Sequence, residues 1–448
     1  LDLYENEMAS RPYQDRLYEL ALEGYVRKSL AAADFLYHLG EVPAAQKIYA
    51  DLIREDDSLL QAHRGFIKCA AARKQIGKVS EEYRTRLLKD PDDATGLYGL
   101  GLCLTYEGDK KSLEEAQKLI QKAIGINGQI AYLHQTSGYI SEVMETVYGL
   151  PGGLEAAMES YQKAYFLNDQ EKDPVNGANL SLNLGNISFL LGQFPDAFES
   201  YSRRLASGAP FDNEETEILF YRRLGETAFQ IREHRQPAQA YEKALALIEK
   251  RIDPRRASEI AGKINSHIFD RILTPALKNP DLAEKARSIA LAQTEISRRL
   301  FDATEGMTGF PPDPRWGVYK KKMEAILSDQ KKVIRELPPF IPENPAETTD
   351  DLLYMSGRAA ETLKFPENLV RMKAEMLDRL GLALQEERMW RQAREAFEKA
   401  YALNEGLGLV QNLAVNRRSM AYCAYMEAET LPGDERKQML EKAYEGFQ

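Results

Sequence analysis

One stretch near the end of the chain, residues 374–404, constrains the fold more than any other: AEMLDRLGLALQEERMWRQAREAFEKAYALN. Its apolar residues recur every three or four positions, which predicts two short amphipathic helices joined by a tight turn. Small residues stand where the two helices would touch, and large apolar residues flank them. The small residues are Gly381, Ala393 and Ala400, and the large ones are Leu377, Leu380, Leu384, Trp390 and Phe397.

This pattern resembles the tetratricopeptide repeat, a helical hairpin with Leu-Gly in its first helix and Ala, an aromatic residue and Ala in its second. Similar stretches occur at about 29–58, 60–91, 94–127, 130–168, 178–208 and 218–248, the second of them degenerate. No segment shows the alternation of a β-strand. We therefore predict an all-α protein, a right-handed α-solenoid of tetratricopeptide-like hairpins with a helical insertion that departs from the repeat pattern.

The pattern divides the chain into four predicted segments. An N-terminal helix occupies 1–28, about six repeats follow at 29–249, and further repeats occupy 349–448. Between them, 250–348 lacks the small-residue signature and contains a Pro/Gly-rich loop at 305–317. Residues 250–337 contain 18 Lys/Arg against 12 Asp/Glu, a net charge of +6, whereas the rest of the chain carries −16.

Charge and composition argue against several classes of function. The formal net charge of −10 makes the chain a poor candidate for binding nucleic acid. No apolar run is long enough to predict a membrane span. Three widely spaced cysteines, Cys69, Cys103 and Cys423, form no disulfide or zinc pattern and are compatible with the cytoplasm or a bacterial periplasm. The chain starts with Leu1 and ends within a predicted helix, so we expect a fragment or a processed chain.

The resemblance implies a concave surface, lined by the first helices, that binds a peptide or a partner subunit. The family uses the non-core positions of the first helix for these contacts. Asn amides bond a peptide backbone, and Arg binds a carboxylate. A second polar patch is expected on the long helix after residue 408. The candidate residues are Asn179, Asn183 and Asn186 in the fifth repeat, Arg222 and Arg223 in the sixth, and Asn412 and Asn416 in the patch.

The basic insertion offers a further interaction hypothesis. Its loop region contains Phe310, Trp316 and Tyr319, followed by Lys320–322. We expect it either to fold back onto the acidic repeats or to dock an acidic partner.

No catalytic or cofactor motif is predicted. The five histidines do not pair at metal-ligand spacing, and the Gly-rich GLYGLG at 96–101 lies within a predicted helix rather than after a strand. We predict a non-catalytic protein-interaction scaffold with no cofactor and no metal. One alternative is the regulatory or substrate-recruiting arm of a larger enzyme, and another is self-association through the ends of the solenoid.

Overall fold

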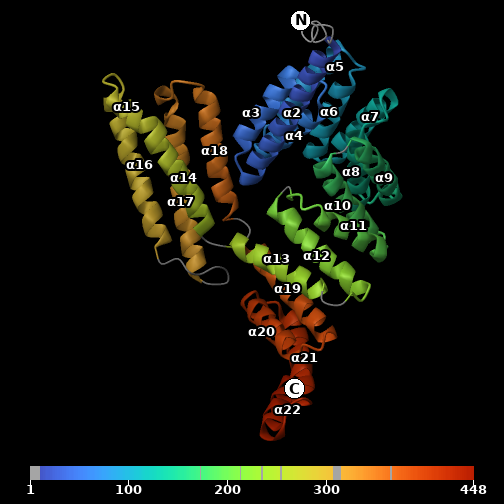
Figure 1. Ribbon diagram of the computed structural model, residues 1–448. Coiled ribbons are helices and arrows are strands. Elements are labelled where there is room, and N and C mark those ends of the chain that lie inside the picture. The colour runs from blue at the N-terminus through green and yellow to red at the C-terminus, as the bar shows by residue number, and fades with distance from the viewer. Residues whose placement is uncertain are drawn as a thin grey trace, which may run out of the picture. The chain divides into compact units, whose positions relative to one another are not determined.

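The computed structural model describes residues 11–171, 173–211, 213–233, 236–252, 255–305, 314–363 and 366–447, and every regular element in these ranges is a helix. The chain divides into two compact units, Leu1–Asn213 and Glu214–Gln448. Figure 1 labels the helices of both units. The prediction of an all-α repeat fold is confirmed.

The first unit is a stack of helical hairpins in which each helix packs against the next one along the chain. The helices pair as first and second members of successive repeats. They are α2 (Arg11–Leu39), α3 (Val42–Glu55), α4 (Leu60–Ala72), α5 (Ile76–Lys89), α6 (Ala94–Glu107), α7 (Lys110–Ile126), α8 (Ala131–Thr146), α9 (Gly153–Glu171), α10 (Pro174–Leu190) and α11 (Phe194–Ala206).

The second unit continues with hairpins of the same kind. They are formed by α12 (Glu214–Gln230) with α13 (Gln236–Ile252), α19 (Pro366–Glu386) with α20 (Trp390–Gly406), and α21 (Val410–Ala428) with α22 (Gly433–Phe447). Helix α13 packs directly on α19, although the whole insertion separates them in sequence. One apolar core joins them, with Ile248 and Tyr241 of α13 beside Val370 and Leu377 of α19.

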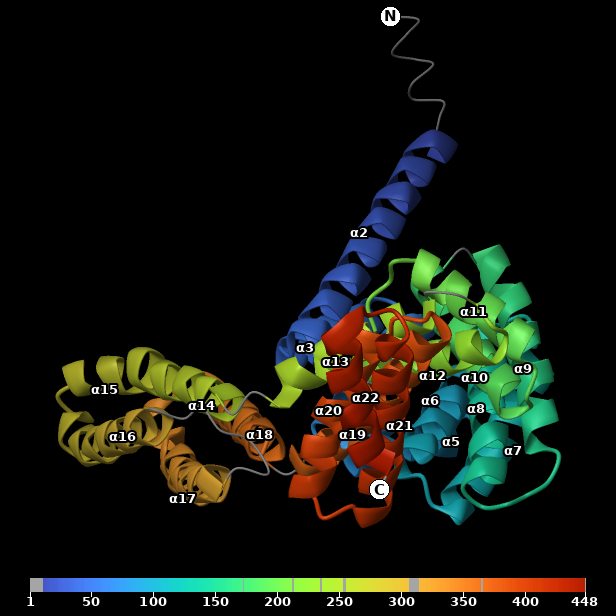
Figure 2. The same ribbon diagram turned by 90° about the horizontal axis from the view of Figure 1, so that it is seen from below.

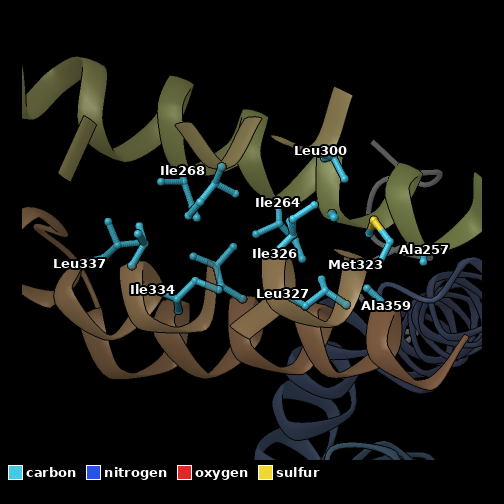
Figure 3. Packing of buried hydrophobic residues seen from close by; sticks show 14 of the residues in the cluster. Ala257, Ile264, Ile268, Leu300, Met323, Ile326, Leu327, Ile334, Leu337 and Ala359 are labelled. Carbon is cyan, nitrogen blue, oxygen red and sulfur yellow. The ribbon is translucent and has the colours of Figure 1, made fainter. Parts of the chain in front are cut away.

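The insertion forms a helical bundle with a core of its own. It contains α14 (Arg255–His267), a π-helical turn η1 (Ile268–Leu273), α15 (Thr274–Lys278), α16 (Ala283–Thr304), α17 (Pro314–Glu336), the 3-10 turn η2 (Pro338–Phe340) and α18 (Pro345–Glu361). Helices α14, α16, α17 and α18 surround the core, in which Ile264 and Ile268 meet Ile326 and Ile334 (Figures 2 and 3). The insertion is therefore a compact bundle between two helices that belong to adjacent repeats.

The tight turn between the two helices of a repeat requires a left-handed residue. In the fifth repeat Gly192 has φ +72°, and the Gln193 N–H closes the helix end by donating to the Ser188 carbonyl at 2.8 Å. Arg388 takes the same place at φ +61°, and the Met389 N–H donates to the Leu384 carbonyl at 2.9 Å. The hydrogen-bond geometry of the helix end therefore fixes this turn even where the residue is not glycine.

Candidate partner-binding surfaces

Two of the three predicted asparagines on α10 have no hydrogen bond to another described residue. Asn179 and Asn183 are half-buried and lie one turn apart, so their amides share one face of the helix. Asn186, almost one turn further on, accepts a hydrogen bond from the Tyr201 hydroxyl at 3.0 Å. The structure thus leaves two amides of this set available to a ligand and uses the third within the repeat.

A polar bridge connects the beginning of α10 with two earlier first helices. Asp173 caps α10 by accepting from the backbone N–H groups of Val175 and Asn176 at 3.1 and 3.0 Å. Its other oxygen accepts from the Gln61 amide of α4 at 2.9 Å and from the Tyr132 hydroxyl of α8. The contact of Gln61 with Asp173 joins first helices of repeats that are not neighbours. Such helices meet on the inner side of a curved stack, so this contact marks the inner face of the first unit.

Arg64 strengthens this bridge. Its guanidinium donates to the Asn176 side chain of α10 at 2.7 Å and lies over the ring of Tyr132, 5.1 Å from the centroid. Asn176 is buried and donates in turn to Asn168 of α9 at 2.9 Å. Because every polar group named here has a partner, the bridge fixes the curvature of the first unit rather than offering a binding site.

Further along the same helix faces lie side chains that the sequence analysis missed. Tyr106 follows Tyr98 by two turns on α6, and Tyr139 follows Tyr132 by two turns on α8; both later tyrosines are nearly half exposed, at 45% and 46%. Burial raises the pKa of Tyr139, and the nearby Glu142 carboxylate raises it further, so this hydroxyl stays protonated. The signal in the sequence was the occurrence of two tyrosines, seven or eight residues apart, in each of these first helices.

In the second unit, Arg222 belongs to a network of four charges that links α12 to α19. Its guanidinium contacts Glu375 at 2.8 Å and Glu226 at 3.4 Å. Arg379 contacts the same two carboxylates, at 3.1 and 2.7 Å. Arg223 is half-buried at the next position of α12. The network holds Arg222 in place and leaves it partly accessible.

The structure separates the two asparagines predicted to form a patch on α21. Asn412 is exposed, whereas Asn416 is completely buried. The Asn416 amide donates to Asp378 of α19, and its oxygen accepts from Asn404 of α20 at 2.8 Å. Burial raises the pKa of Asp378 to about 6, although these two amides oppose the shift. Asn416 therefore joins three helices inside the repeat and does not share a surface with Asn412.

Two of the three aromatic residues predicted as a docking site near the loop of the basic insertion lie in its core. Trp316 and Tyr319 are buried, with ring centroids 5.5 Å apart. Phe310 lies outside the described residues. Lys321 and Lys322 are exposed on α17 and Lys320 is half-buried. The two described aromatic rings thus stabilise the bundle and do not form an outer docking surface.

Within the described residues, no group of three His, Cys, Asp or Glu side chains could hold a metal ion, and no helix is long and apolar enough to cross a membrane. His63 is an internal residue, since its ring bonds the Tyr83 hydroxyl at 2.6 Å and the Asp57 carbonyl at 3.0 Å. Burial lowers the pKa of His63 and favours the neutral ring.

The contacts within the hairpins identify the kind of repeat. A Cβ atom added to Gly185 would lie 2.6 Å from the ring of Tyr201, sixteen residues later, and one added to Gly381 would lie 2.6 Å from Phe397 at the same spacing. A Cβ atom added to Gly225 would likewise lie 2.7 Å from the ring of Tyr241, again sixteen residues later. These hairpins are tetratricopeptide-like repeats. Tetratricopeptide-like hairpins form the first unit, and in the second unit they precede and follow the bundle in the sequence.

Comparison with known proteins adds structural neighbours but no closer relative. No protein-family model matches the sequence, and no curated protein matches it. The structure is similar to TTC0263, a thermophilic TPR protein of Thermus thermophilus, at 19% identity over 44% of this chain and 98% of that chain, with a TM-score of 0.33. Pseudomonas aeruginosa PilF is similar at 19% identity over 49% of this chain and 92% of that chain, with a TM-score of 0.33. YrrB, described as a TPR protein with an unusual peptide-binding site, is similar at 16% identity over 44% of this chain and 91% of that chain, with a TM-score of 0.30.

Proposed function

We propose that this chain is a protein-interaction scaffold and that the inner face of its first unit binds an extended peptide segment of a partner protein. The observation that carries the proposal is the pair Asn179 and Asn183. Their amides are half-buried and lack a partner among the described residues, while the polar groups of the neighbouring bridge are paired. An Asn side chain both donates and accepts, so two amides one turn apart match the alternating groups of a peptide backbone.

The rest of the inner face supports the same type of ligand. Tyr106 and Tyr139 present rings and hydroxyl groups, which contribute contact area at a low cost in side-chain entropy. Lys68 of α4 lies over the Tyr37 ring, 4.2 Å from its centroid, and adds a positive charge to this face. We therefore propose a peptide with small apolar side chains and at least one carboxylate.

Other predicted residues enter the proposal as additional contacts. Asn186 and Arg222 are partly accessible and already oriented by Tyr201 and Glu375, so a partner would meet preformed groups. Arg223 and the exposed Asn412 are proposed contacts of the second unit. No catalytic step is assigned to any of them.

The proposal is tested with an array of immobilised peptides probed by the full chain. The double variant Asn179→Ala/Asn183→Ala is expected to lose about tenfold in binding to the peptides that the wild type selects, as for one or two hydrogen bonds to a partly buried backbone. Glu159→Ala/Gln162→Ala is the control, because both side chains are exposed on α9, a second helix. Equal binding by the asparagine variant and the wild type would rule out the inner face as the peptide site.

A further inference from the structure

The second unit contains a groove on the side of α19 that faces away from the charge network. It has a volume of about 870 Å³ and lies between α13, α19 and α20. Its floor is apolar and just reaches the surface, since Leu377, Leu380 and Leu384 are 5%, 8% and 7% exposed. Ala238 of α13 and Ala396 of α20 form the two sides. Small side chains at these two positions leave room above the leucines.

Most of the charged residues around this groove form no ion pair with another described residue. Glu242, Glu386 and Glu387 line it and form no ion pair with another described residue. One oxygen of Glu387, Oε1, is shielded from solvent and accepts no hydrogen bond within the described part of the chain. A shielded carboxylate oxygen without a donor is costly, so this group is poised for a donor from outside the chain.

Several other charged residues on the same helices are paired within the fold. On α19, Glu375 and Arg379 bind Arg222 and Glu226 of α12. On α20, Arg394 contacts Glu398 at 2.7 Å and Glu427 of α21 at 3.2 Å. Glu242, Glu386 and Glu387 at the groove form no such pair within the described residues. Carboxylates outnumber bases there, with four Glu against Arg388 and Lys399, so the groove favours a cationic ligand.

The floor also specifies the shape of the ligand. Leu377, Leu380 and Leu384 are spaced i, i+3 and i+7, so they form one apolar seam along α19 about 10 Å long. A seam of this length is matched by two to three turns of a second helix whose own apolar residues have the same spacing. An extended strand would place alternate side chains away from the floor and would leave part of it uncovered.

We propose that this groove docks a short basic amphipathic helix from a partner protein. Its apolar residues would cover Leu377, Leu380 and Leu384, and a Lys or Arg beside them would donate to Glu387. This surface is separate from the inner face of the first unit. The scaffold would then bind one partner through an extended peptide and another through a helix.

The test uses a displayed library of randomised helical peptides, selected against the full-length wild-type chain. The enriched peptides are expected to carry apolar residues at i, i+3 or i+4, and i+7, with a Lys or Arg alongside. Fluorescence anisotropy with the best labelled peptide should show about tenfold weaker binding to Glu387→Gln, the effect of losing one charge-assisted hydrogen bond. Replacing the basic residue of the peptide by Met should abolish the difference between the two proteins.

Two further variants make the result decisive. Ala238→Leu fills the groove without removing a core side chain and should abolish binding. Glu405→Gln removes an exposed carboxylate of α20 outside the groove and should bind like the wild type. Peptides that bind Ala238→Leu and the wild type equally, or an enriched set that is acidic, would overturn the proposal. Light scattering that shows a wild-type dimer lost in Ala238→Leu would assign the groove to a second copy of the chain instead.

Discussion

At Gly381 the backbone of α19 lies against the ring of Phe397, and this single contact sets the distance between two helices. A Cβ atom there would lie 2.6 Å from the ring, which is well inside van der Waals contact. The ring is buried, so it has no free space to move into. We predict that Gly381→Ala lowers the free energy of unfolding by about 1–3 kcal/mol, measured by urea denaturation of the full chain.

Gly357 of α18 provides the matched control. No atom lies within 4 Å of a Cβ added there, and the residue is inside a helix. Gly357→Ala should therefore raise stability by up to about 1 kcal/mol, because Ala loses less backbone entropy in a helix. A gain in stability of the same size in both variants would show that helix propensity, and not the close approach to Phe397, decides the effect.

Asp378 makes the stability of the second unit depend on pH. Burial raises the pKa of this carboxyl to about 6 from an ordinary value of 3.8, so the folded chain holds its proton more tightly than the unfolded chain. Stability is then lost as pH rises through the interval from about 4 to 6. At pH 7 the Asp378→Asn variant should be about 1–2 kcal/mol more stable than the wild type, a difference that already allows for the partial exposure of the carboxyl. Below pH 4 the two proteins should be equally stable. Urea titrations of both proteins at several pH values measure this difference; a constant difference across pH would contradict it.

The buried position of Asn416 could not be predicted from the sequence. Its neighbours Arg417 and Arg418 are exposed, and its spacing from Asn412 fits one helix face, so a surface position was a reasonable prediction. The decisive contacts come from Asp378 and Asn404 on two other helices. Hydrogen-bond partners that come together only through tertiary packing produce no periodic pattern in the sequence. The contact of Gly381 with Phe397 does produce one, because equivalent contacts recur at a fixed sequence spacing.

At the scale of elements, the bundle contains a polar layer inside an apolar core. Asn265 of α14 accepts two hydrogen bonds through its side-chain oxygen, from Gln293 of α16 at 2.6 Å and from Gln330 of α17 at 2.7 Å. Gln293 and Gln330 are completely buried. Three atoms of this layer have no partner within the described residues: the Asn265 nitrogen and the two glutamine oxygens. The layer therefore fixes how three helices fit together at a cost in stability.

This layer predicts opposite effects for partial and complete replacement. Asn265→Leu leaves the buried Gln293 amide without an acceptor and leaves the Gln330 amide only the Ala261 carbonyl, at 3.0 Å. It should lower stability by about 2–4 kcal/mol. The triple variant Asn265→Leu/Gln293→Met/Gln330→Met removes every polar group of the layer and should regain most of that loss. Thermal and urea denaturation of the full chain measure both. If the triple variant loses about the sum of three single losses, the amides are net stabilising and the interpretation is wrong.

The helical-repeat fold was predictable at the element scale, and the connection of the repeats across the bundle was not. Small and aromatic residues at fixed offsets predicted the hairpins, and their absence marked the segment 250–348 as different. The packing of α13 on α19 joins residues on either side of that segment. A contact at such a sequence separation depends on the bundle folding compactly, and no local pattern in either helix reports it.

At the scale of the whole molecule, two apolar cores in the described part of the second unit have no residue in common. One contains Ile264, Ile326 and Ile334 of the bundle, and the other contains Tyr241, Leu377 and Phe397 of the repeats. Cooperativity in helical repeats passes from neighbour to neighbour through shared core contacts. Because the two cores share none, we expect the bundle and the repeat stack to open separately under native conditions.

Hydrogen exchange of the full chain followed by mass spectrometry tests this expectation. Asn265→Leu should speed exchange in α14, α16 and α17 and leave α19 and α20 unchanged, whereas Gly381→Ala should do the reverse. In the double variant the two losses of protection should add, since the sites have no common contact. Faster exchange of α19 and α20 in Asn265→Leu would show one cooperative unit instead. In that case the bundle would contribute to the stability of the repeats that flank it, and binding to the repeats would be coupled to the bundle.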